Sequence, residues 1–148
     1  MPIPDLNAEG YLPPGIHDCT LEEIGVRFGR FQGTERRSRL FERLQLLTGE
    51  ALSTGLVVGI IVNGSFVTGR PDPNDIDLIL VLRDKDVLRH ELRPFEYNVL
   101  SRRRVRQRHG FDIRLAAENQ REYNEYVEFF QRVKEQPERR KGLLRVRL

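Results

Sequence analysis

Two apolar runs and two alternating segments mark the predicted strands. The runs Leu56–Val62 and Ile76–Leu82 are rich in Val, Ile and Leu, and each is short enough to be a buried strand. Phe111–Leu115 alternates, with Asp112 and Arg114 on one side of the strand and its apolar residues on the other. The final segment, Leu143–Leu148, also alternates and is predicted to be a strand at an edge of the sheet.

Two helices are predicted in the first part of the chain. The pattern at Thr20–Glu23 is a capping box, which starts a short helix that ends near Phe28. A longer helix is predicted from Thr34 to about Thr54, and its arginines, including Arg37, are expected to lie mostly outside its apolar stripe. The stripe consists of four residues at helical spacing: Leu40, Leu44, Leu47 and Ala51.

Two further helices are predicted in the second part. Pro94 suits the first position of a helix that runs to about His109. The end of this helix, Arg102–His109, is strongly basic and is either a solvated helix end or a surface for nucleic acid or phosphate. An amphipathic helix is predicted from Glu118 to about Lys134, followed by a turn at Gln136–Gly142.

This order of elements predicts an α+β fold, with a mixed β-sheet and helices packed on it in a single domain. Residues 1–33 are expected to form an extended, proline-containing arm and a short helix that pack on the core. Residues 34–148 are expected to form the domain itself.

The candidate chemistry lies between the two apolar runs. Asp75 and Asp77 are separated by one residue at the start of the second run, so both carboxylates are expected to project to the same side of the strand. Two neighbouring carboxylates raise each other's pKa unless a cation lies between them. A hard divalent cation with a preference for oxygen ligands, most simply Mg²⁺, explains the pair.

These residues resemble the signature of the nucleotidyltransferase superfamily, which has the polymerase-beta-like fold. Gly64-Ser65 is followed by the spacer Phe66–Asn74 and then by the Asp-x-Asp pair, in the order that the family uses. The family also has a third acidic residue on a later strand, and Asp112 matches it. The resemblance covers about residues 56–115 and implies a nucleotidyltransferase-like domain.

The resemblance implies a role for each of these positions. Asp75 and Asp77 would hold two Mg²⁺ or Mn²⁺ ions, and Asp112 would bind one of them and assist proton removal. Gly64 and Ser65 would bind the β- and γ-phosphates of an NTP such as ATP. Two arginines could also reach the phosphates: Arg70 and Arg114.

Two of these side chains have alternative roles, and the domain has alternative functions. Arg70 could instead face solvent, and Asp112 could form an ion pair with Arg114 at a sheet edge. The alternative to an enzyme is a catalytically silent domain of the same fold that binds nucleotide, RNA or a partner protein. A metal-dependent phosphohydrolase is less well supported, because the histidines show no metal-ligand spacing: His17, His90 and His109.

The resemblance also implies partners. Small stand-alone members of the superfamily occur in toxin–antitoxin or defence gene pairs, where the acceptor of the nucleotide is a tRNA or a protein. Because this chain has little beyond the catalytic core, its acceptor could be selected by a partner chain or by the amino-terminal arm. A homo-oligomer is also possible. The acceptor of this chain is therefore expected to be a hydroxyl of RNA or of a protein.

Composition bears on the charge of the expected ligand, on the state of the cysteine and on the cellular location. The chain of 148 residues has a formal net charge of +3, and most of its cations are arginines, which suit phosphate oxygens. Cys19 is the single cysteine, so it forms no internal disulfide and is expected to be a buried thiol. No apolar run approaches the roughly 20 residues of a membrane span, and no signal segment is evident, so a cytoplasmic protein is expected.

Overall fold

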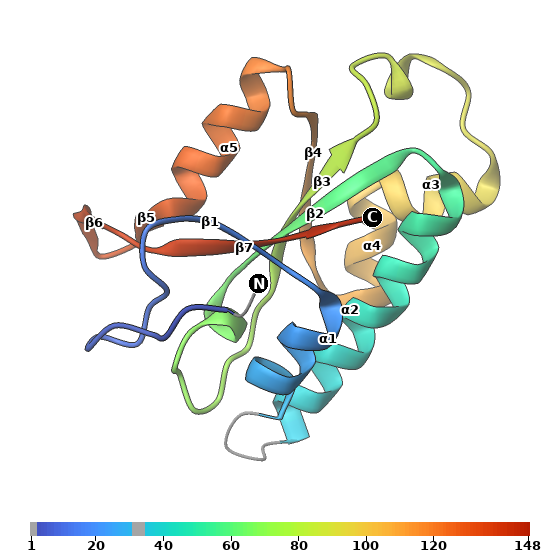
Figure 1. Ribbon diagram of the computed structural model, residues 1–148. Coiled ribbons are helices and arrows are strands. Elements are labelled where there is room, and N and C mark those ends of the chain that lie inside the picture. The colour runs from blue at the N-terminus through green and yellow to red at the C-terminus, as the bar shows by residue number, and fades with distance from the viewer. Residues whose placement is uncertain (1–2, 31–34) are drawn as a thin grey trace.

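A mixed five-stranded β-sheet forms the centre of the computed structural model, which describes residues 3–30 and 35–148 (Figure 1). In spatial order the strands are β1 (Gly15–Cys19), β7 (Gly142–Arg147), β2 (Val57–Asn63), β3 (Asp77–Leu82) and β4 (Asp112–Ala117). The pairs β1/β7 and β3/β4 are parallel, whereas β7/β2 and β2/β3 are antiparallel. The prediction of an α+β domain built on a mixed sheet is confirmed.

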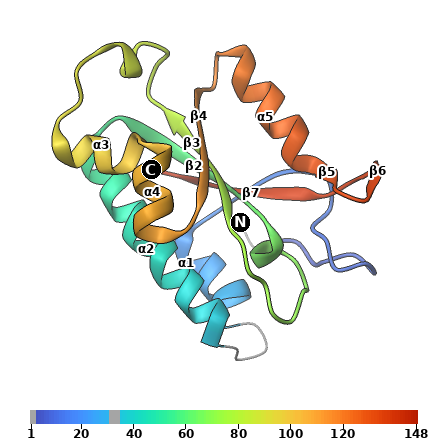
Figure 2. The same cartoon turned by 180° about the vertical axis from the view of Figure 1, so that it is seen from behind.

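Helices cover both faces of this sheet (Figures 1 and 2). They are α1 (Leu21–Ile24), α2 (Glu35–Thr54), α3 (Pro94–Leu100), α4 (Arg102–His109) and α5 (Arg121–Gln131). The helices α1 to α4 pack on one face, where Leu44 of α2 and Leu78 of β3 belong to the same core cluster. On the other face, α5 packs Tyr123 and Phe130 over Ile79. Alternate residues of β3 therefore belong to two separate cores.

Several local predictions are confirmed. Thr20 and Glu23 form the predicted capping box, since Thr20 Oγ1 accepts from the Glu23 N–H at 3.1 Å and Glu23 Oε1 accepts from the Thr20 N–H at 2.9 Å. Helix α2 extends from Glu35 to Thr54, and the predicted start at Thr34 lies outside the described residues. Cys19 is buried, and burial raises the pKa of its thiol to about 12. Within the described part of the chain, every helix is too short or too polar to cross a lipid bilayer.

The helix predicted from Pro94 to His109 is instead two helices with a break at Ser101. Ser101 has an extended backbone conformation, and its Oγ accepts from the Arg104 N–H at 3.2 Å to cap α4. The break has a packing reason, because Leu100 and Val105 are both buried. Residues five positions apart on one straight helix point about 140° away from each other, so an unbroken helix could not bury both on the same side.

The carboxyl-terminal strand lies in the interior of the sheet, so its prediction as an edge strand was wrong. Strand β7 lies between β1 and β2, and its neighbouring residues Leu143 and Leu144 are both fully buried, on opposite faces. The strand β1, which belongs to the predicted extended arm, pairs with β7 on the side away from β2. The alternation within a strand does not show whether a second strand pairs with its free edge. Here that partner, β1, is distant in sequence, so the interior position of β7 could not be recognised.

The segment between α5 and β7 forms a hairpin instead of a helix end and a turn. Strands β5 (Arg132–Val133) and β6 (Gln136–Arg140) make a separate two-stranded antiparallel sheet. The predicted helix Glu118–Lys134 is therefore too long at both ends. Helix α5 ends at Gln131, because Arg132 pairs with Arg140 in the hairpin. In Figure 1 the hairpin projects beyond one end of the large sheet.

Candidate functional site

The end of β2 and the starts of β3, β4 and β7 lie side by side at one end of the five-stranded sheet, and this row of strand ends is called the edge of the sheet below. Strands β3 and β7 are antiparallel to β2, so both start beside the end of β2, and β4 starts beside β3. In this register Asn63 lies opposite Asp77, and Asp77 lies opposite Asp112. Directly paired residues project from the same face of a sheet. The side chains of Asn63, Asp77 and Asp112 therefore form a row across three neighbouring strands, on one face of the sheet.

A cavity of about 1180 Å³ opens over this row. It is lined by all seven residues that the sequence singled out: Gly64, Ser65, Arg70, Asp75, Asp77, Asp112 and Arg114. Further walls come from the amino-terminal segment around Tyr11 and from the β5–β6 hairpin. The fold thus brings the predicted site residues together, from segments that are up to 50 positions apart in the sequence (114 − 64).

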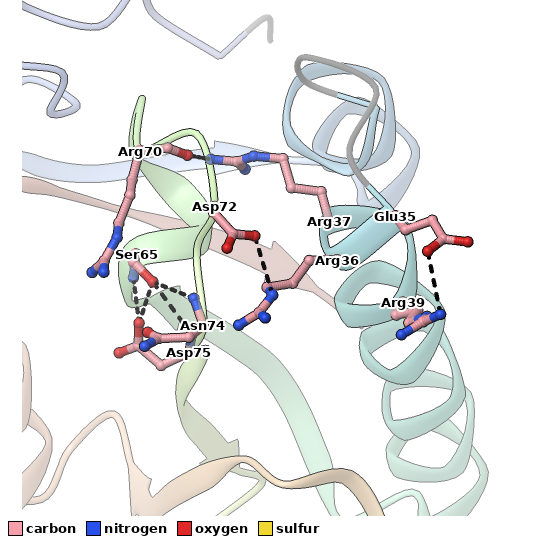
Figure 3. Close-up of polar contacts among 9 residues, drawn as sticks. All are labelled: Glu35, Arg36, Arg37, Arg39, Ser65, Arg70, Asp72, Asn74 and Asp75. Carbon is pink, nitrogen blue, oxygen red and sulfur yellow. Dashed lines mark hydrogen bonds and ion pairs between the residues drawn. The ribbon is translucent and has the colours of Figure 1, made fainter.

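The loop between β2 and β3 is folded around Ser65 (Figure 3). The Ser65 hydroxyl and the Ser65 N–H, the latter at 3.0 Å, both donate to Oδ1 of Asp75. The same hydroxyl oxygen accepts from the Asn74 N–H at 3.1 Å and from the Asp75 N–H at 3.3 Å. Gly64 has φ +104°, and a Cβ at this position would lie 2.7 Å from the Asp75 carbonyl oxygen. Glycine is therefore needed for the loop to return to the end of β2, and Ser65 orients the Asp75 carboxylate.

Arg37 of α2 holds the same loop from the other side (Figure 3). Its Nη1 donates to the carbonyl oxygens of Phe28 at 3.1 Å and Phe66 at 2.6 Å, and its Nη2 to those of Thr68 at 2.9 Å and Arg70 at 2.6 Å. The side chain is fully buried, and burial lowers its pKa to about 10. The prediction that Arg37 lies outside the buried stripe was therefore wrong. Its burial is offset by these hydrogen bonds to four backbone carbonyl oxygens.

The electrostatics of the cavity centre on Asp77. Burial raises the pKa of its carboxyl, and the nearby charge of Asp75 raises it further. The positive charges of Lys141 and Arg114 oppose this shift but do not reverse it. A carboxyl whose ionised form is disfavoured by burial and by a like charge is a group that a bound cation would stabilise. Asp75 and Asp77 are therefore the residues here that could hold a metal ion.

Asp112 is engaged differently. Its carboxylate forms an ion pair with Arg106 of α4 and not with Arg114, the partner considered from sequence. In the part of the chain that the structure describes, no three acidic, histidine or cysteine side chains are grouped closely enough to hold a metal. For Asp112 to join Asp75 and Asp77 at a shared ion, Arg106 has to release it.

The two candidate phosphate-binding arginines differ in how they are held. The Arg114 guanidinium lies over three aromatic rings of α5, at 5.3, 5.4 and 5.7 Å from the centroids of Tyr126, Phe129 and Phe130. Such contacts fix a cation while leaving its edge N–H groups available. Arg70 is anchored through its carbonyl oxygen, and its exposed side chain extends away from Arg37 (Figure 3).

Sequence reasoning missed two residues of this cavity. Asn63 is 4% exposed, and its Oδ1 has no hydrogen-bond partner among the described residues. The signal for it was a polar residue directly after an apolar run, on the same face as Ile61. Lys141 also lines the cavity, although it is remote from the motif in sequence and was predicted to be in a turn. No local pattern identified it.

These observations define a class: a single-domain α+β protein with acidic residues and a rim of cations in a cavity at one edge of a mixed sheet. Residues 4–147 match the sequence profile of a family described as a family of unknown function, DUF6932, and the chain belongs to this family. Neither a curated protein nor a solved structure gives a significant match to the chain.

Proposed function

We propose that this protein is a divalent-metal-dependent nucleotidyltransferase that moves an NMP from an NTP to a hydroxyl acceptor. The observation that carries the proposal is the convergence of the seven motif residues on one cavity, with Asp77 and Asp112 in direct register on neighbouring strands. The strand order also supports a nucleotidyltransferase-like fold, because the Gly-Ser turn and the acidic strand starts occupy one edge of the sheet.

The acidic pair fits a divalent cation. Asp75 is oriented by Ser65, and burial together with the charge of Asp75 raises the pKa of Asp77. Mg²⁺ or Mn²⁺ held by Asp75 and Asp77 would supply charge neutralisation for the triphosphate and the leaving pyrophosphate. Asn63 lies opposite Asp77, and its Oδ1, which has no partner among the described residues, could accept a hydrogen bond from a water near the carboxylates.

The remaining residues have roles in binding and proton transfer. In the present state the Ser65 N–H and hydroxyl orient Asp75, so Ser65 becomes available to phosphate when the carboxylate turns toward a cation. The edges of Arg70 and Arg114 then face the phosphates. Asp112, once released by Arg106, accepts the proton of the attacking hydroxyl.

The acceptor is a hydroxyl of RNA or of a protein. Three exposed cations among the residues that line the cavity, which also include Glu9 and Glu135, could contact a polyanion such as RNA: Arg102, Arg132 and Lys134. The second candidate function is a silent domain that binds nucleotide or RNA without chemistry. The ion pair between Arg106 and Asp112 favours this candidate, because it occupies the carboxylate that the reaction needs.

The two candidates are separated by incubating the purified protein with each α-labelled NTP, Mg²⁺ or Mn²⁺, and either total RNA or a protein extract. We expect label to be transferred to one acceptor class with one preferred NTP, and we expect transfer to stop when EDTA removes the metal. Metal-dependent NTP binding without label in any acceptor would contradict transfer and support the silent domain.

A further inference from the structure

Lys141 is placed rigidly at the entrance of β7. Its N–H donates to the carbonyl oxygen of Gln131 at 2.8 Å, and the N–H of the next residue, Gly142, donates to that of Leu12 at 2.9 Å. A Cβ at Gly142 would lie 2.0 Å from the carbonyl oxygen of Pro13, so the chain passes here with no room for a side chain. The α5–β5 junction and the amino-terminal segment therefore fix the point from which the Lys141 side chain extends into the cavity.

The Lys141 side chain lines the same cavity as the acidic pair. Lys141 is half-buried and lines the cavity with Asp75 and Asp77, and their charges act on one another. None of the ion pairs within the described residues involves Lys141, whereas Arg114, the other cation that acts on Asp77, lies against the aromatic rings of α5. Lys141 is thus an ammonium group on a fixed backbone, in the same cavity as the carboxylates.

We infer that Lys141 at the start of β7 is a substrate-binding residue that partly neutralises Asp75 and Asp77 in the empty site and binds a phosphate oxygen of the nucleotide in the loaded site. The inference rests on the proposed function. A metal ion held by Asp75 and Asp77 would neutralise the same carboxylates, so their attraction for the Lys141 ammonium group would weaken. The flexible stem of lysine then allows its point charge to reach the phosphates over the same acidic pair.

This role of Lys141 predicts that its replacement by Met changes two affinities in opposite directions, that for the metal ion and that for the nucleotide. Without the ammonium group, Mn²⁺ alone should bind about three- to tenfold more tightly, because a like charge is removed from its neighbourhood. A non-hydrolysable NTP analogue in the presence of saturating Mn²⁺ should bind at least about tenfold more weakly, because a charge-assisted hydrogen bond is lost. Mn²⁺ binding is followed by electron paramagnetic resonance, and analogue binding by calorimetry.

Three variants make the test specific. Lys85→Met, at an exposed lysine remote from the cavity lining, should leave both affinities unchanged within about twofold. Lys141→Arg should restore most of the analogue affinity, which a purely packing role would not require. Asp77→Asn should lose Mn²⁺ binding. Thermal unfolding of each variant checks that it is folded.

The outcomes distinguish the inference from the proposed function. If Asp77-dependent Mn²⁺ binding is present but Lys141→Met weakens it or leaves it unchanged, the exchange role of Lys141 is wrong and the metal site stands. If the parent protein binds no Mn²⁺ in an Asp77-dependent way, both the metal site and the role of Lys141 are overturned.

Discussion

Replacing Asp77 by Asn is expected to reduce nucleotidyl transfer by about 100- to 1000-fold, the range seen when one electrostatic contact to a transition state is removed, without destabilising the fold. The carboxylate is one half of the pair that would hold the metal, and asparagine is a neutral ligand of the same shape. The rate of label transfer from the preferred α-labelled NTP measures the loss.

The difference in the free energy of unfolding between the parent and Asp77→Asn should depend on pH, and the direction follows from the raised pKa of Asp77 in the parent. The pKa of Asp77 is raised in the folded protein from its ordinary value of 3.8, so ionisation of this carboxyl disfavours the folded state. Its contribution to stability is fully present below 3.8 and is lost as the pH rises through the folded-state pKa. At pH 7 the Asn variant should therefore have a free energy of unfolding equal to or above that of the parent, and the difference should shrink at pH 3.5.

Asp72→Asn is the matched control, because Asp72 is in the same loop but exposed and paired with Arg36 at 3.1 Å. It should transfer label at close to the parental rate. A folded Asp77→Asn protein that transfers at the parental rate would show that Asp77 does not hold the metal.

Replacing Arg37 by Met is expected to lower the free energy of unfolding by about 3 kcal/mol or more, since several buried carbonyl oxygens lose their donor. Four carbonyls depend on this guanidinium, three of them in the segment between β2 and β3. Because that segment also carries Ser65 and Asp75, transfer should fall along with stability. Urea unfolding measures the first effect, and the label-transfer rate measures the second.

The neighbouring Arg36 gives the control for Arg37. Arg36 is exposed, and its ion pair with Asp72 lies on the surface (Figure 3). Its replacement by Met should cost less than about 1 kcal/mol. Arg37→Lys should recover only part of the stability, because a single ammonium group cannot reach carbonyls on both sides of the loop. Equal losses in Arg36→Met and Arg37→Met would contradict the role of Arg37.

Local patterns in the sequence were sufficient for β2, β3 and β4 and for the acidic residues at the starts of β3 and β4. The runs that became β2 and β3 are apolar because both of their faces are covered by helices, and this leaves a clear boundary at Asn63 and Asp77. The position of Arg37 also had a signal that the prediction did not use. Residues 37, 40, 44, 47 and 51 are spaced alternately by three and four, so Arg37 continues the buried stripe of α2.

Other features depend on contacts between distant segments. The interior position of β7 depends on β1, which lies near the opposite end of the chain, and the place of Lys141 depends on the β5–β6 hairpin. The ion pair of Asp112 with Arg106 requires the break at Ser101 and the turn that follows α4. Such pairings are not visible in a window of neighbouring residues, because sequence periodicity reports which face is buried but not by which partner.

The most direct test of the proposed metal site is a crystal structure with Mn²⁺ and a non-hydrolysable analogue of the preferred NTP, with the metal located by its anomalous scattering. We expect an anomalous peak about 2.0–2.3 Å from carboxylate oxygens of both Asp75 and Asp77, the range for hard divalent cations bound by oxygen, with Asp112 released from Arg106. A peak elsewhere, or an analogue bound while Asp75 and Asp77 hold no metal, would contradict a nucleotidyltransferase site at this edge of the sheet.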